Sequence, residues 1–127
     1  MKRTKGQVEA EISNAMIQFE KDFMGRGPKE TKTFIVDDIV LVRLKGVLTQ
    51  AEQQLAKNSE GMELIKKIRS NLIEQARELL TEVIEKITGL KVVSLHTDIS
   101  TKTGERVILF IMNESLEERF RNHNNFT

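Results

Sequence analysis

The longest regular pattern of hydrophobic and polar positions in the chain lies between residues 59 and 89. Apolar residues recur there every three or four positions, which is the period of an α-helical face. The main stripe consists of Ile65, Ile68, Leu72, Ala76, Leu79, Val83 and Ile87, and a second stripe beside it of Ile73, Leu80 and Ile84. Ser59 is a suitable N-cap, and Gly89 is a suitable stop. The pattern predicts one helix, on the order of 40 Å long, as the spine of the molecule.

A second amphipathic helix is expected over residues 6–24. Its apolar stripe consists of Val8, Ile12, Ala15, Phe19 and Phe23. The charged side chains of both helices, including Glu20 and Arg69, are expected to face solvent or to flank the stripes. Two glycines and a proline in residues 25–28 end this helix.

Strand patterns flank the long helix on both sides. Residues 31–44 are rich in β-branched side chains and are interrupted by Asp37-Asp38, which favours a hairpin turn but leaves a bulge in one strand open. Residues 49–52 have the form of a capping box and predict a short helix to about residue 57. Residues 92–99 alternate in polarity, and residues 106–112 are apolar almost throughout, which favours a central place in a sheet.

The order of these elements predicts an α+β fold. We expect an antiparallel sheet of three to four strands, with the long central helix and the N-terminal helix packed on one face. The 127 residues suffice for a single domain, 1–127, with a core at about 5–113. Residues 114–127 are polar and are expected to form a short helix or a tail.

Composition narrows the class of function. The 20 basic and 19 acidic residues leave a formal net charge of +1, which gives no electrostatic case for nucleic acid. The absence of cysteine excludes thiolate chemistry and fits a cytoplasmic protein. No apolar run approaches the roughly 20 residues of a membrane span, so we expect no direct insertion, and any link to a membrane must go through a partner.

Two places could hold chemistry. His96 and Asp98 alternate on one strand face, with Arg106 across the turn, and a histidine beside an aspartate is a possible general base or metal ligand. A solvated face with a surface ion pair explains the same residues and is preferred. Arg26 and Gly27 lie in a glycine loop that could hold an anion, although a plain turn is the favoured interpretation.

These five residues are the candidate ligand or anion site. No catalytic set, metal site or cofactor motif is found, so we expect no enzyme activity and no cofactor.

The long helix has more apolar surface than a small sheet can cover. We therefore expect a homodimer formed through this helix, unless its extra apolar residues meet the first helix instead. The candidate interface consists of Leu72, Leu79, Leu80, Val83 and Ile84.

Several motifs together resemble a known family. They are Gly25-Arg26-Gly27-Pro28, residues 39–44, residues 45–49 with Glu52, and residues 96–100 with Thr103-Gly104-Glu105. Over about residues 5–113 the chain resembles a small bacterial family that was once a domain of unknown function. That family is also described as the MpsC-type component of a sodium-translocating, membrane-potential-generating system.

The resemblance implies a non-catalytic cytoplasmic accessory or regulatory subunit of a membrane cation or bicarbonate transport system, with a membrane transporter as partner. The alternative is a dimeric domain that senses a small anion or metabolite. The family defines no catalytic residues that could be carried over to this chain.

Overall fold

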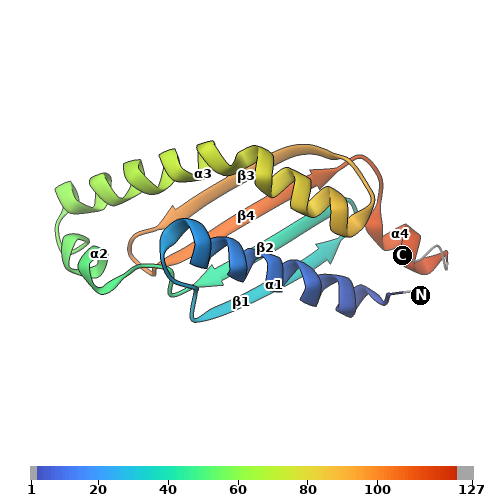
Figure 1. Cartoon of the computed structure of the whole chain (residues 1–127), viewed down its shortest axis with the longest axis horizontal. Helices are drawn as coiled ribbons and strands as arrows, with labels where there is room; N and C mark the ends of the chain where they lie inside the picture. The colour runs from blue at the N-terminus through green and yellow to red at the C-terminus, as the bar shows by residue number, and fades with distance from the viewer. Residues whose placement is uncertain (1–2, 123–127) are drawn as a thin grey trace.

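Two helices and a four-stranded sheet form the body of the protein (Figure 1). The computed structural model describes residues 3–122. In chain order the elements are α1 (Lys5–Met24), β1 (Glu30–Val36), β2 (Ile39–Lys45), α2 (Gln50–Leu55), α3 (Ser59–Thr88), β3 (Val92–Ser100), β4 (Glu105–Met112) and α4 (Leu116–Arg121). The predicted α+β class is confirmed, with four strands in the sheet.

The sheet is antiparallel throughout, in the order β1-β2-β4-β3. β1 and β2 form one hairpin, β3 and β4 form another, and β2 pairs with β4 at the centre. Asp37 and Asp38 make the turn of the first hairpin, which decides between the two interpretations of this pair. Asp37 takes a left-handed φ of 54°, and its carbonyl accepts a hydrogen bond from the backbone of Leu116, where α4 begins.

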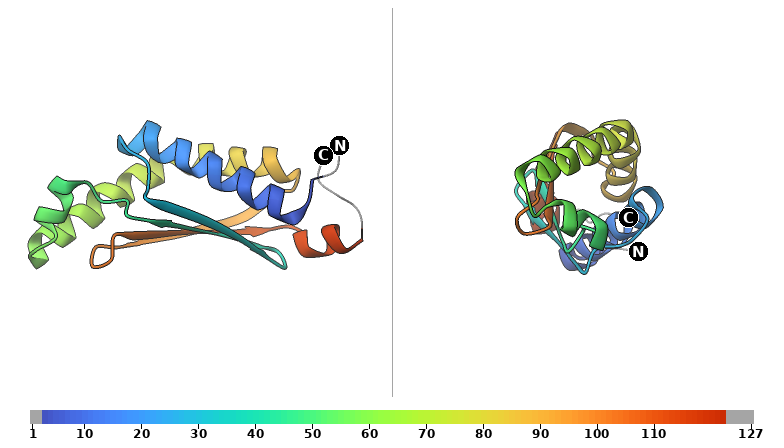
Figure 2. Two further views of the ribbon diagram at one scale, coloured as in Figure 1. Left: turned by 90° about the horizontal axis from the view of Figure 1, so that it is seen from below. Right: turned by 90° about the vertical axis from the view of Figure 1, so that its left-hand side faces the viewer.

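α1 and α3 lie on one face of the sheet, and no helix in the described part of the chain covers the other face (Figure 2). The core lies between these layers. It includes Val8, Ile12 and Met16 of α1, Ile73, Leu80 and Ile84 of α3, and Val40, Val42, Ile108 and Phe110 of the sheet. Burial of this apolar area is the main favourable contribution to folding.

The buried face of α3 is rotated from the expected main stripe. The sheet side takes Ile65, Arg69, Ile73, Ala76, Leu80, Ile84 and Thr88. By contrast, Ile68 is 49% and Leu79 41% exposed. The stripe with two polar members is the buried one because both find partners: Arg69 binds Glu52, and the Thr88 hydroxyl donates to the carbonyl of Ile84.

The corner between α2 and α3 depends on close backbone approach. α2 ends at Leu55, earlier than expected, and α3 is capped by Asn58, whose side chain accepts from Gly61 N–H, rather than by Ser59. A Cβ at Gly61 would lie 1.7 Å from the carbonyl oxygen of Leu55. Residues 123–127, with His123, lie outside the described residues.

Candidate functional site

Three connecting segments meet at the end of the sheet opposite the labelled chain termini (Figure 1). Arg26, in the loop after α1, donates from Nη1 to the carbonyl of Leu48 at 2.6 Å. Val47 N–H donates to the carbonyl of Gly104 at the β3–β4 turn, at 3.0 Å. The motif segments 25–28, 45–49 and 103–105, which are far apart in sequence, therefore converge in space.

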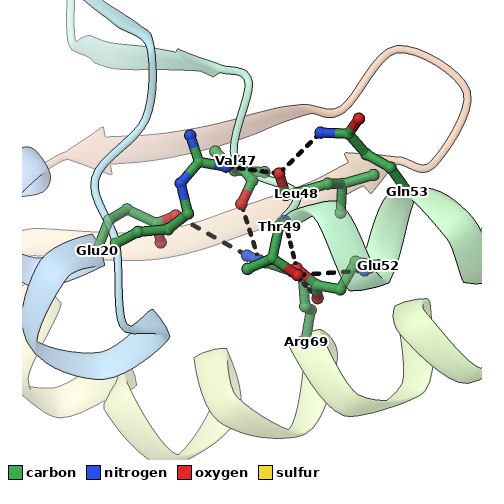
Figure 3. A network of polar contacts seen from close by, with 8 residues as sticks. Glu20, Val47, Leu48, Thr49, Glu52, Gln53 and Arg69 are labelled. Atoms are coloured by element: carbon green, nitrogen blue, oxygen red, sulfur yellow. Dashed lines mark hydrogen bonds and ion pairs between the residues drawn. The ribbon is translucent and has the colours of Figure 1, made fainter.

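Arg69 is the centre of a polar network at this end (Figure 3). Its guanidinium is buried and binds Glu52 with two hydrogen bonds, Nε to Oε2 at 2.8 Å and Nη2 to Oε1 at 2.7 Å. Nη2 also donates to the carbonyl of Val47 at 2.9 Å. Such a bidentate pair fixes geometry as well as charge. Arg69 thus ties α3 to α2 and to the loop after β2.

Glu52 also caps α2. Its Oε1 accepts from Thr49 N–H at 2.9 Å, and its own N–H donates to the Thr49 hydroxyl at 3.2 Å. This is the capping box that the sequence predicts, and it is confirmed. The capping carboxylate is therefore the same group that binds Arg69.

Glu20 and Arg106 are buried beside this network. Glu20 Oε1 lies 3.9 Å from Arg69 Nη1, and Arg106 donates from Nη1 to the Thr97 hydroxyl at 2.8 Å. Both carboxylate oxygens of Glu20, Nη1 of Arg69, and Nε and Nη2 of Arg106 make no hydrogen bond within the described residues. Buried polar atoms of this kind carry a desolvation cost.

Burial and charge move the pKa values of the two acids in opposite directions. Burial raises the pKa of Glu20, and the attraction of Arg69 and Arg106 offsets only part of that rise. Burial also acts to raise the pKa of Glu52, but the hydrogen bonds from Arg69 and Thr49 outweigh it, so the pKa is lowered. The chemistry open to this cluster is the gain or loss of a proton at Glu20.

A cleft of about 640 Å³ lies next to the cluster. Lys29 and Lys102 belong to its lining, together with Gln53 and the threonines of the β3–β4 turn, Thr101 and Thr103. Ammonium groups, hydroxyls and an amide are suited to holding a small anion.

The five residues of the predicted anion site do not come together. The guanidinium of Arg26 donates a hydrogen bond to the Leu48 carbonyl, and Gly27 lies beside the side chain of Lys21. His96 and Asp98 are exposed at outward positions of β3, and His96 contacts Ser94 at 3.1 Å.

Arg106 is buried on the opposite, helix-covered side of the sheet, so it does not share a face with Asp98. The reason is strand alternation: Asp98 pairs with Val107, and Arg106, the residue before Val107, points the other way.

The residues of the predicted helix interface also divide. Leu80 and Ile84 lie in the core of their own chain, Leu72 and Val83 are half-buried, and Leu79 is exposed. The two buried residues therefore have no surface to offer a second copy.

The sequence pattern predicts that Glu20 and Arg69 face solvent or flank the apolar stripes, and the structure shows both buried. A signal for each is present in the sequence. Arg69 stands four residues from both Ile65 and Ile73, and Glu20 stands four residues after Met16. A charged residue in step with apolar neighbours is a candidate for burial, and it is the fold that supplies the partner of opposite charge.

No helix of residues 3–122 combines the length and apolar character needed to cross a bilayer. No three or more histidine, aspartate and glutamate side chains in the same residues gather as a metal site would require.

Comparison with known proteins gives one family and two relatives. A family model described as "Na+-translocating membrane potential-generating system (MpsC)" matches residues 4–114. The uncharacterized protein YbcI of Bacillus subtilis strain 168 is 49% identical over 118 residues, covering 93% of this chain and 95% of YbcI. The uncharacterized protein YrhF of the same strain is 28% identical over 110 residues, covering 86% and 90%. No solved structure matches the chain significantly.

Proposed function

Because the chain belongs to the MpsC family, we propose that it is a non-catalytic accessory subunit of a membrane cation or bicarbonate transport system. In this proposal the protein acts in the cytoplasm and reaches the membrane by binding a transporter. The family description, which names a sodium-translocating system, supports the cation link. An accessory subunit acts through a surface that binds its partner, so such a surface must be present on this protein.

The observation that carries the proposal is an exposed apolar ridge on α3. This α3 ridge consists of Leu64, Ile68, Leu72 and Leu79, which helical spacing places along one side of the helix. All but Leu72 belong to the large apolar side chains that the fold leaves most exposed. The first half of α3 also projects beyond the end of α1 (Figure 2). An apolar ridge on a projecting helix is suited to packing against a partner's helix or groove.

The arrangement of charged groups supports a binding role over catalysis. Arg69, Glu52 and Arg26 are all engaged in holding the loops together. His96 is exposed, and the hydrogen bond recorded for its ring is to Ser94. Catalysis by acid, base and nucleophile requires free groups of this kind around one point. Arg69 and Glu52 are bound to each other, and His96 lies on the other face of the sheet from them.

The proposal is tested by affinity purification of the tagged full chain from gently solubilised native membranes. We expect one transport protein to be recovered with the wild type and lost with Ile68→Glu, because a charge in the ridge disrupts apolar packing. Val93→Glu, at an exposed apolar position on β3, is the matched control and should retain the partner. Circular dichroism confirms that each variant is folded.

Recovery of no transport protein with the wild type would contradict the proposal. Equal recovery with Ile68→Glu would remove the α3 ridge as the docking surface.

A second candidate, sensing of a small anion, is favoured by the cleft that Lys29 and Lys102 line. A ligand that binds only the folded state raises the melting temperature in a saturable way. We expect phosphate or bicarbonate to do so and Lys102→Ala to abolish the effect. No stabilisation by any anion of the panel would set this candidate aside.

A further inference from the structure

The face of the sheet away from the helices is apolar on three of its strands. We call this surface the outer sheet face (Figure 2). Its outward residues on β1, β2 and β4 include Phe34, Val36, Ile39, Leu41, Val107, Leu109 and Ile111. Phe34 is 40% and Val36 57% exposed.

This composition departs from that of a sheet face adapted to water. An antiparallel sheet with one solvated face normally places polar residues outward, in alternation with the apolar inner ones. Here β2 and β4 are apolar on both faces over residues 39–42 and 107–112. With four strands about 4.8 Å apart and a rise of about 3.3 Å per residue, the face measures about 19 Å by 20 Å. The apolar part of this face, on β1, β2 and β4, is smaller than the whole, and apolar patches of roughly a few hundred Å² are often functional.

The strand register arranges the outer sheet face in rows. The first row, from β1 to β3, reads Lys32, Arg43, Val107 and Asp98. The second reads Phe34, Leu41, Leu109 and His96, and the third Val36, Ile39, Ile111 and Ser94. The two ends of this row are therefore oppositely charged, with basic Lys32 on edge strand β1 and acidic Asp98 on edge strand β3, and we call these two residues the corner charges. Glu30 with Lys45 and Ser100 with Glu105 form the pairs one step further toward the strand ends.

Both corner charges are available to a partner. The side chain of Lys32 is 61% exposed, and its ion pair within residues 3–122 is a long one, to Glu30 at 3.8 Å. The side chain of Asp98 is 83% exposed and lies 3.7 Å from Lys66. Ion pairs this long and this exposed contribute little to stability, so exchanging them for a closer pair costs little.

We propose that the outer sheet face binds the same face of a second copy of this chain, about a two-fold axis parallel to the strands. Such an axis reverses the strand order, so β1 lies over β3 of the second copy and β2 over β4. The axis leaves positions along the strand direction unchanged, so each row lies over the same row of the second copy. Lys32 of each copy then faces Asp98 of the other, Phe34 faces His96, and Leu41 faces Leu109. Arg43 lies over Val107 of the second copy and keeps its ion pair with Glu105 of its own chain. The face is thus complementary to itself in charge at Lys32 and Asp98 and in apolar character along the other two rows.

The other two-fold axis in this plane does not give this match. An axis perpendicular to the strands places β1 over β1 and reverses the order of the rows, so Lys32 meets Val36 and Asp98 meets Ser94. That packing buries a lysine against a valine without a partner, which is unfavourable. Two aligned sheets pack about 10 Å apart, with their strand directions rotated by about −30°. This rotation displaces Lys32 from Asp98 of the second copy, and the long lysine side chain can span that displacement.

This interface is independent of the α3 ridge, which lies in the opposite layer. It also differs from a dimer through α3, because Leu80 and Ile84 are inside the core. The projected area, on the order of 400 Å², is below that of a standard interface, about 800 Å² a side. We therefore expect a dimer that dissociates on dilution.

The test is sedimentation equilibrium of the full chain over a range of protein concentrations. The wild type should convert from monomer to dimer, and Leu109→Asp should raise the dissociation constant by at least about tenfold, because it places a charge in the apolar centre. Ile68→Glu, on the α3 ridge, is the matched control and should leave the dissociation constant unchanged. Circular dichroism verifies that the variants are folded.

Charge reversal tests the axis without altering the apolar centre. Lys32→Glu and Asp98→Lys should each raise the dissociation constant by about threefold to tenfold, and the double variant should return it to within about twofold of the wild type. The proposal is overturned by a wild type that stays monomeric at all concentrations, or by a dimer lost with Ile68→Glu and kept with Leu109→Asp. A double variant weaker than either single variant would overturn the proposed axis.

Discussion

Arg69 joins three segments that lie far apart along the chain. It stands on α3, binds the capping carboxylate of α2 and the carbonyl of Val47, and lies 3.9 Å from Glu20 of α1. Removing one partner of a buried ion pair leaves the other charge buried and uncompensated. The loss of the Arg69 side chain should therefore lower the free energy of unfolding far more than the loss of a surface arginine.

We predict that Arg69→Met lowers the free energy of unfolding by about 3–5 kcal/mol. Arg77→Met is the matched control, because Arg77 is on the same helix and also donates to a backbone carbonyl, that of Leu95, but is 39% exposed. That change should cost about 1 kcal/mol or less. Urea denaturation measures both values, and equal losses would contradict a special role for the buried cluster.

Glu20 and Glu52 make the free energy of unfolding depend on pH in opposite directions. The pKa of Glu20 in the folded state is above its reference value of 4.5, so stability that depends on its neutral form is present below about pH 4.5 and is lost as the pH rises through the folded pKa. The pKa of Glu52 is lowered, so its contribution is present above that reference value and is lost as the pH falls through the folded pKa.

We therefore predict opposite pH trends for two glutamine variants. Relative to the wild type, Glu20→Gln should gain stability as the pH rises from 3 to 7, and Glu52→Gln should lose it over the same interval. Urea denaturation at a series of pH values measures both differences. Parallel trends in the two variants would be inconsistent with the opposite pKa shifts.

At the scale of elements, the α2–α3 corner is the most tightly constrained connection. Gly61 is in helix α3, yet no side chain fits there, because a Cβ would lie 1.7 Å from the Leu55 carbonyl oxygen. We predict that Gly61→Ala destabilises the protein by about 1–3 kcal/mol through displacement of α2.

Gly6→Ala supplies the comparison for this corner. Gly6 is also helical and has nothing within 4 Å of an added Cβ, so the change should stabilise by up to about 1 kcal/mol. Thermal denaturation followed by circular dichroism measures both. Tolerance of alanine at both glycines would show that the corner can relax.

The elements themselves could largely be predicted from periodicity. The long helix, the first helix, the capping box at Thr49 and the two C-terminal strands follow from local patterns, and the structure confirms each. The buried side of α3 could not be chosen, because two apolar stripes lie side by side and only the fold brings Glu52 to Arg69. A local pattern cannot show which of two neighbouring apolar stripes is buried when the choice depends on an ion pair between residues far apart in the sequence.

The candidate site was less predictable for the same reason. The loop of Arg26 and the turn near Gly104 are each recognisable in the sequence, but their approach at the Val47–Leu48 backbone depends on the whole sheet. The sequence pattern places Arg106 across the turn from His96 and Asp98, but strand alternation puts Arg106 on the opposite face of the sheet.

At the scale of the whole molecule, the two proposed binding surfaces, the α3 ridge and the outer sheet face, lie in opposite layers of the protein. A dimer through the outer sheet face would have four layers, with a helical layer on each outside. Each α3 ridge would then face outward on the opposite side from the other. Such a dimer would bind two copies of a partner, one at each α3 ridge, and so link them to each other. It would not bind one partner molecule through both ridges.

The sheet order β1-β2-β4-β3 also divides the chain into two similar halves. Each half is a helix followed by a hairpin, α1 with β1–β2 and α3 with β3–β4, and the halves meet along the β2–β4 seam. Contacts within a half are close in sequence, whereas the seam joins residues 39–44 to 106–111. Since local contacts form first, each half should take shape before the seam closes, and Glu20 and Arg69, one from each half, become buried only at that last step.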